Sequence, residues 1–67
     1  MLTPDVNGLQ LQVGDTVRVR VHWRHEKRIG IIAEIREGIA TEPVFIVSLD
    51  NGGVSIPLWG FELERLP

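Results

Sequence analysis

Residues 16–36 read TVRVRVHWRHEKRIGIIAEIR, and this stretch decides the fold. Its first part, 16–22, alternates three valines with Arg18, Arg20 and His22. Strict alternation with β-branched residues is the clearest sequence sign of a strand that is buried on one face. A register slip of one residue would bury two arginines, so the pattern also determines which face is inside. The stretch therefore predicts a strand over 16–22 with its valines in the core.

The second part of the stretch is predicted to return as a strand over 29–36. The alternation assigns Ile31, Ala33 and Ile35 to the core face of this strand. Gly30 lies near its start, where a glycine is typical of a bend or bulge at the corner of a barrel. The basic residues between the two strands form their connection. The whole stretch thus predicts a β-hairpin with a positively charged outer surface.

A third strand is predicted over 44–49. These residues are apolar almost throughout, which is typical of a strand that is covered on both faces, with every second residue from Phe45 facing inward. The cover of the other face must come from the N-terminal segment, a terminus or another chain. If the N-terminus leaves Val44 and Ile46 uncovered, these two residues are predicted to form an apolar assembly strip that drives self-association or subunit docking.

Turn residues and short alternating segments account for the rest of the chain. No segment shows helical periodicity over three turns, and glycine or proline interrupts every candidate. Trp59 and Phe61 are expected to plug the open end of the core from a single turn. The other predicted elements are a turn at 6–9, a half-buried extended segment at 9–13, a turn at 14–15, a loop at 37–42, a hairpin turn at 50–53, an edge strand at 54–58 with Pro57, and a last strand at 62–66 with Leu63 inward.

These elements predict an all-β fold: a small barrel of about five short antiparallel strands in a single domain, 1–67. Residues 1–8 are expected to be poorly ordered or to pack late. The 67 residues contain no cysteine, so neither a disulfide nor a thiolate metal site stabilises the fold. No apolar run approaches the roughly 20 residues that span a bilayer, and no signal-peptide pattern is present. A cytoplasmic protein without membrane insertion is therefore expected.

The charges are distributed unevenly along the chain. The net charge is −2, yet residues 18–36 contain six basic and two acidic side chains, a surplus of four positive charges. The remainder of the chain contains one arginine against seven carboxylates. Such polarity favours encounter with an acidic partner through the basic stretch. Alternatively, neighbouring strands neutralise the charges pairwise on a solvated surface.

The order of motifs resembles the SH3-like barrels of bacteria. The motifs are VGDTVRVRV at 13–21, RIGIIAEI at 28–35, PVFIVSLDNG at 43–52 and FELERL at 61–66. Three branches are similar: electron-transport accessory proteins, such as PsaE of photosystem I and the variable chain of ferredoxin–thioredoxin reductase; the KOW-type domains of ribosomal and transcription proteins; and small uncharacterised bacterial proteins. The resemblance implies an SH3-like barrel, a docking role in the first branch and nucleic-acid contact in the second.

Two departures from these families narrow the expected function. His25 and Glu26 stand where KOW loops usually carry glycines, which weakens an RNA-binding assignment. The chain has no tyrosine, so recognition of proline-rich peptides in the manner of eukaryotic SH3 domains is not expected. VSIP at 54–57 and ELERL at 62–66 resemble the closing strands of plasmid-borne dihydrofolate reductases, but the overlap is a few residues and an enzyme is not expected.

The candidate binding surface gathers the basic and aromatic residues of the hairpin. Trp23 could stack on a nucleobase or cover a protein interface, or it could fold over the mouth of the barrel. His22 and His25 with Glu26 do not reach the three or four ligands of a zinc site, so neither a metal nor another cofactor is expected. The candidate binding residues are Arg18, Arg20, His22, Trp23, Arg24, Lys27 and Arg28.

Two functions are compatible with this surface. The first is a non-catalytic binding module that acts as a docking or regulatory subunit of a larger complex, with an acidic protein as partner and homo-oligomers possible. The second is a KOW-like domain whose arginines contact the phosphate backbone of a nucleic acid. The acidic remainder of the chain favours the first, because attraction to a polyanion depends on more than one face.

Overall fold

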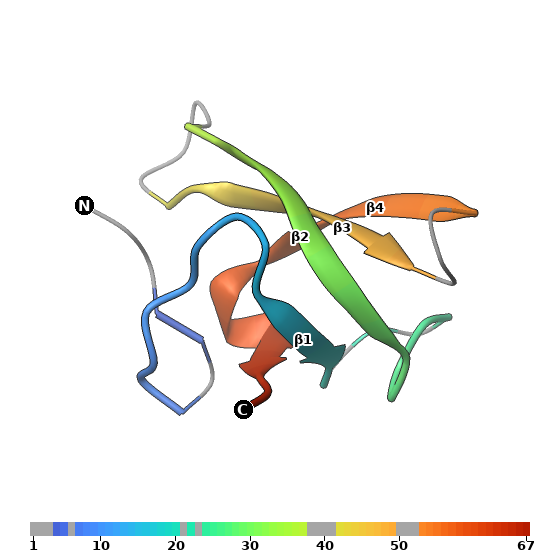
Figure 1. Ribbon diagram of the computed structural model, residues 1–67, viewed down its shortest axis with the longest axis horizontal. Coiled ribbons are helices and arrows are strands. Elements are labelled where there is room, and N and C mark those ends of the chain that lie inside the picture. The colour runs from blue at the N-terminus through green and yellow to red at the C-terminus, as the bar shows by residue number, and fades with distance from the viewer. Residues whose placement is uncertain (1–3, 6, 21, 23, 38–41, 50–52) are drawn as a thin grey trace.

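The structure, a computed structural model, describes residues 4–5, 7–20, 22, 24–37, 42–49 and 53–67. It is all-β, as predicted, with five antiparallel strands in one sheet (Figure 1). The elements, in chain order, are β1 (Thr16–Val19), β2 (Ile29–Arg36), β3 (Val44–Leu49), β4 (Val54–Trp59), the short 3₁₀ helix η2 (Gly60–Glu62) and β5 (Leu63–Arg65).

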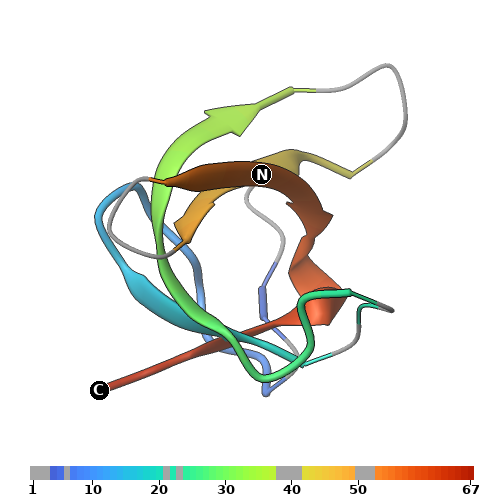
Figure 2. The same ribbon diagram turned by 90° about the vertical axis from the view of Figure 1, so that its right-hand side faces the viewer.

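The strand order is β4-β3-β2-β1-β5, and the sheet curls around its inner face (Figure 2). β4 and β5 are the two edges, and η2 joins them directly in the chain. Within the described residues no ladder connects these two edges, so the sheet is not closed. Five short antiparallel strands are confirmed, whereas closure into a barrel stays a prediction.

Apolar side chains from all five strands and the N-terminal segment fill the inner face of the sheet. Val17 and Val19 are fully buried, which confirms that these alternating valines turn inward. β3 has the predicted bounds, and every second residue from Phe45 is buried in it. Leu63 also faces inward, as predicted. The buried core comprises Leu11, Val17, Val19, Ile32, Phe45, Val47, Leu49, Leu58 and Leu63.

β1 is shorter than the strand predicted over 16–22. Its hydrogen bonds to the returning chain end at Val19, which donates to the Arg28 carbonyl and accepts from the Lys27 N–H. Lys27, in the connection before β2, has a left-handed backbone with φ of 73°. The chain is therefore not extended at Lys27, which lies opposite the end of β1. Val21, which was predicted to face inward, lies outside the described residues.

β2 turns a different set of side chains inward than the alternation predicts. Ile32 is fully buried and Ile35 packs against the core, whereas Ile31 and Ala33 are exposed. The β2–β3 register shifts between Ile32 and Glu34, which marks a β-bulge. A bulge adds one residue to one strand and so reverses the phase of the alternation. The core assignment is confirmed for Ile35 and was wrong for Ile31 and Ala33.

The N-terminal segment contains two turns, at the positions where the sequence predicts them. Gly8 and Gly14 have φ of 85° and 96°, values that L side chains rarely adopt. Between the turns, Leu11 is fully buried, but Leu9 and Val13 are exposed. The prediction of an alternating half-buried segment is therefore correct for Leu11 alone.

Asp5 joins the N-terminal segment to the far edge of the sheet. One of its carboxylate oxygens accepts from the N–H groups of Asn7 and Leu9, at 2.9 and 2.7 Å. The other accepts from the Arg65 N–H in β5, at 2.6 Å. Asp5 is only 4% exposed, so these bonds are shielded from water. This contact lies within residues 1–8, for which poor order or late packing is expected.

The aromatic residues around η2 do not plug the core. Phe61 is 56% exposed and Trp59 is half-buried, and neither belongs to the buried core, so the prediction for both was wrong. The Glu62 carboxylate accepts from the Trp59 N–H at 2.8 Å and so closes the turn. Leu58 fills the core at this point instead. Pro57 lies on the edge strand β4, as predicted for a residue without an N–H donor.

Candidate functional site

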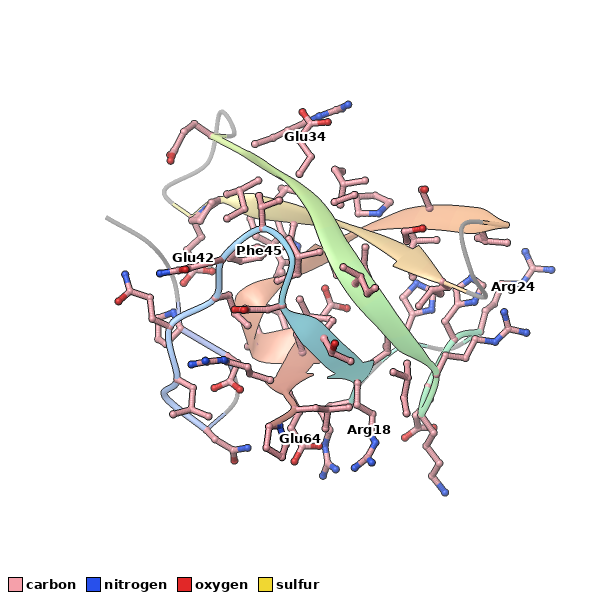
Figure 3. The ribbon with its side chains drawn as sticks, in the orientation of Figure 1. Arg18, Arg24, Glu34, Glu42, Phe45 and Glu64 are labelled. Atoms are coloured by element: carbon pink, nitrogen blue, oxygen red, sulfur yellow. The ribbon has the colours of Figure 1, made fainter. Side chains whose placement is uncertain are left out.

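Arg18 of β1 and Arg20, which directly follows β1, lie on the outer face of the sheet, where they meet Glu64 of β5. Arg18 and Glu64 are directly opposite each other in the β1–β5 ladder. They lie side by side at the surface, away from Glu34 and Arg24 (Figure 3). Val17 and Val19 occupy the inner face of the sheet. Because successive side chains of a strand point to opposite faces, Arg18 lies on the outer face.

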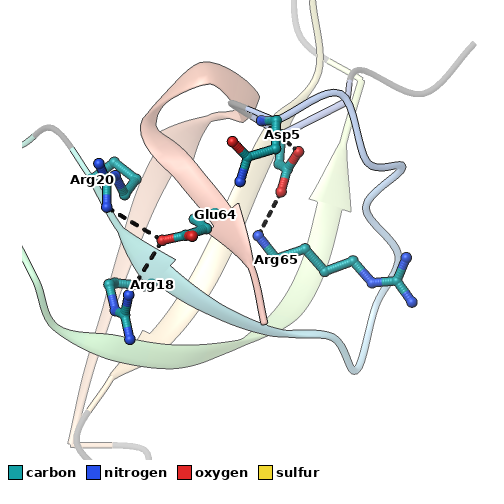
Figure 4. A network of polar contacts seen from close by, with 6 residues as sticks. Asp5, Arg18, Arg20, Glu64 and Arg65 are labelled. Atoms are coloured by element: carbon teal, nitrogen blue, oxygen red, sulfur yellow. Dashed lines mark hydrogen bonds and ion pairs between the residues drawn. The ribbon is translucent and has the colours of Figure 1, made fainter. Parts of the chain in front are cut away.

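One carboxylate oxygen of Glu64 serves both arginines. The Nη1 atoms of Arg18 and Arg20 each lie 3.4 Å from Glu64 Oε1 (Figure 4). The two arginine side chains are 40% and 51% exposed, and the Glu64 side chain is 23% exposed. One carboxylate neutralises only one of two guanidinium groups, and both retain N–H donors toward water. Pairwise neutralisation of these arginines is therefore incomplete.

The hairpin connection brings further basic groups to the end of β1. Arg24, Lys27 and Arg28 are exposed. We define the basic hairpin surface as the described members of the predicted set, Arg18, Arg20, His22, Arg24, Lys27 and Arg28. Two described carboxylates lie close to it: Glu26 lines a small hollow with Arg18, Arg20 and Lys27, and Glu64 pairs with Arg18 and Arg20. Trp23 lies outside the described residues, so its two predicted roles stay predictions.

His22 forms hydrogen bonds with two neighbouring residues of the connection. Its Nδ1 accepts from the N–H groups of Arg24 and His25, at 3.1 and 3.2 Å. The rings of His22 and His25 lie 4.9 Å apart. His22 is half-buried, and it shapes the loop that carries the basic groups. Its structural role was not visible in the sequence, which marks His22 only as a polar residue of the alternating strand.

A small hollow lies between β1 and the connection. It is lined by Arg18, Val19, Arg20, Glu26 and Lys27 and has a volume of about 100 Å³. Three of these side chains are cationic, so the hollow suits an anionic group such as a carboxylate or a phosphate. Its size fits one such group and not a whole cofactor.

Elsewhere on the described surface, two ion pairs each join one arginine to one carboxylate. Arg36 pairs with Glu34, and their closest atoms are 2.8 Å apart. The hydrogen bond and the charge attraction between the two side chains lower the pKa of Glu34 and raise the pKa of Arg36. Arg65 lies 3.7 Å from Asp15. Among the described residues, each of these two pairs joins one arginine to one carboxylate, whereas Glu64 is shared by two arginines.

The predicted assembly strip is only half exposed. Val44 and Ile46 are both half-buried and lie beside Trp59 and Pro57 of the edge strand. A shallow apolar hollow of about 220 Å³ is lined by Val44, Pro57, Leu58 and Trp59. Ile29 and Ile31 on β2 are more exposed than this strip, at 51% and 52%. Sequence reasoning missed these two because it placed Ile31 in the core.

Within the described residues, no three His, Cys, Asp or Glu side chains form a group that could hold a metal ion. In the same part of the chain, no helix has the length and apolar character needed to cross a membrane. Comparison of the chain with models of protein families, with curated proteins and with solved structures gives no match.

Proposed function

We propose that this protein is a non-catalytic docking or regulatory module that binds an acidic protein partner through the basic hairpin surface. The observation that carries the proposal is the charge surplus around Glu64, where one carboxylate holds two half-exposed arginines. Ordered side chains lose less conformational entropy on binding, so this arrangement favours recognition of carboxylates. Charge complementarity of this kind raises the rate of association and suppresses wrong partners.

We further propose that the chain is an SH3-like barrel protein of the electron-transport accessory type. The five antiparallel strands and the 3₁₀ turn between the two edge strands support this assignment. A cytoplasmic location and assembly into a larger complex belong to the same proposal. The fold alone does not specify a function, so the docking role follows from the charged surface and not from the architecture.

A nucleic acid is the alternative partner, because the hollow beside Lys27 also suits a phosphate oxygen. Two features argue for a protein instead. Glu26 lines the same hollow, and Glu64 neutralises part of the arginine charge. Both carboxylates would repel a continuous phosphate backbone. Binding to single-stranded DNA or RNA at about 50 mM salt, lost steeply as salt rises, would support the alternative.

Neutralising the arginines tests the proposed surface. The double variant Arg18→Gln/Arg20→Gln is expected to bind a glutamate-rich peptide about tenfold more weakly, since two cationic donors are lost. The difference should shrink as salt rises from about 50 to 500 mM. Isothermal calorimetry or NMR titration measures the dissociation constants. Neutralisation is preferable to charge reversal here, because Arg18→Glu would place two carboxylates opposite each other.

The matched control is Arg36→Gln/Arg65→Gln. It removes the same net charge and also breaks two ion pairs, but on other parts of the surface. The control is expected to change the dissociation constant by less than about twofold, since neither arginine lines the hollow beside Arg18 and Arg20 and salt screens charges that make no direct contact. Equal weakening by both double variants would show that net charge, and not the basic hairpin surface, governs binding.

Glu64→Gln makes the opposite change to the same surface. The variant frees both guanidinium groups, so its affinity for the acidic peptide is expected to rise about threefold at low salt. Its free energy of unfolding should change by less than about 1 kcal/mol, because exposed ion pairs contribute little. Peptide titration and urea denaturation check the two values. A fall in affinity with an intact fold would contradict this prediction and show that the order that Glu64 imposes on the two arginines outweighs the charge that it neutralises.

A further inference from the structure

Two exposed isoleucines border the basic hairpin surface. In the β1–β2 ladder, Arg18 is the partner of Ile29 and Thr16 is the partner of Ile31. Directly opposite residues point to the same face of a sheet. Arg18 lies on the outer face with Glu64, so Ile29 and Ile31 lie there too. They are 51% and 52% exposed, and we call them the isoleucine strip.

The isoleucine strip contributes little to the core. Its neighbours Gly30 and Ile32 are the residues that β2 buries. Single exposed apolar residues are common on protein surfaces. Here, however, two successive outward positions are isoleucine, and the cross-strand neighbour of one of them is a cation. The strip and Arg18 therefore lie on one continuous surface.

This combination distinguishes between the two partner classes. A phosphate backbone offers charge but no apolar side chains to cover isoleucine. A protein interface, in contrast, has an apolar centre with charged groups at its rim. Positions i and i+2 of an extended chain are about 7 Å apart, which equals the spacing of the two isoleucines along β2. The surface is thus complementary to an extended protein segment.

We propose that the isoleucine strip and the basic hairpin surface together dock one extended acidic segment of a protein partner. Two apolar side chains of the segment, two positions apart, cover Ile29 and Ile31. Neighbouring carboxylates of the segment bind Arg18 and Arg20. This inference rests on the proposed docking function and narrows its partner from any acidic protein to a segment with both kinds of side chain.

Two synthetic peptides of equal length and net charge test the inference. One has glutamate, leucine, leucine and glutamate at every second position with serine between them, so that all four lie on one face of the extended chain, and the other has serine in place of each leucine. The leucine peptide is expected to bind the wild-type protein about tenfold more tightly in an NMR titration, because it covers apolar surface. Ile29→Thr/Ile31→Thr should remove this advantage and leave binding of the serine peptide unchanged. Threonine keeps the β-branched side chain, so the strand survives.

Val54→Thr is the control. Val54 is an apolar residue that is 38% exposed, but it lies on the edge strand β4, which is separated from β2 by β3. The variant is expected to keep the preference for the leucine peptide. Equal binding of both peptides to the wild type would overturn the inference and leave the docking function intact. Failure of both peptides to bind would overturn the two together. Tighter binding of a single-stranded oligonucleotide than of either peptide, with a steep salt dependence, would replace them with the nucleic-acid function.

Discussion

Asp5→Ala is expected to lower the free energy of unfolding by about 3–4 kcal/mol. The carboxylate accepts three backbone N–H groups while only 4% of the residue is exposed. Hydrogen bonds to a charged group contribute about 1.5–3 kcal/mol each, and bonds that share one group are not additive. Alanine would leave three part-buried backbone donors without their acceptor. Urea denaturation, followed by tryptophan fluorescence, measures the change.

Two further variants test whether the loss of stability comes from the three hydrogen bonds of Asp5. Asp5→Asn keeps one oxygen for the N–H groups of Asn7 and Leu9 but turns an amide toward the Arg65 N–H, so an intermediate loss is expected. Asp15→Ala removes a carboxylate with one exposed hydrogen bond and one ion pair, and should cost about 1 kcal/mol or less. If Asp5→Ala cost no more than Asp15→Ala, the N-terminal segment would be only loosely attached to β5.

The predictable part of the fold is the part in which local pattern and tertiary packing agree. β3 has the bounds expected of a continuous apolar run, and its alternate residues from Phe45 are buried. Val17 and Val19 are inside because a polar face and an apolar face alternate without interruption in β1. The turns at Gly8 and Gly14 follow from the left-handed backbone that glycine tolerates. Each of these features depends on a few neighbouring residues.

The phase of β2 could not be predicted in this way. Its sequence, IGIIAEIR, contains isoleucine at both odd and even positions, so each face offers an apolar set. The bulge between Ile32 and Glu34 allows Gly30, Ile32 and Ile35 to face inward together. A bulge is specified by the pairing with β3, which is a long-range property. The exposed Ile29 and Ile31 follow from the same bulge.

The candidate site was predictable in its residues but not in its pairing. Alternation places Arg18 and Arg20 outside, and the structure agrees. The contact with Glu64 spans 46 positions of the chain and depends on β5 pairing with β1. Charge balance along the sequence could not reveal it, since Glu64 belongs to the acidic remainder. The outer face is therefore less positive than the hairpin sequence alone indicates.

Gly30→Ala is expected to destabilise the fold by about 2–3 kcal/mol, for reasons of space and not of backbone conformation. Gly30 is buried in β2 and is paired with Val17 on one side and Leu49 on the other. A Cβ atom there would lie 2.5 Å from the Ser48 carbonyl oxygen and 2.8 Å from Val47 Cγ1. Overpacking of a tight core costs about 1–3 kcal/mol. Because the oxygen belongs to the backbone of the neighbouring strand, relief requires β2 and β3 to separate.

Gly14→Ala separates this steric effect from the ordinary cost of replacing a glycine. Gly14 has φ of 96° and nothing within 4 Å of the added carbon, so its cost of about 1–2 kcal/mol comes from the left-handed backbone alone. Urea midpoints of the two variants give the comparison, and amide exchange of β2 and β3 locates the damage. Gly30→Ala should open the β2–β3 ladder selectively, while Gly14→Ala leaves it protected. A Gly30→Ala protein as stable as the wild type would show that the two strands do not approach each other as closely as this packing requires.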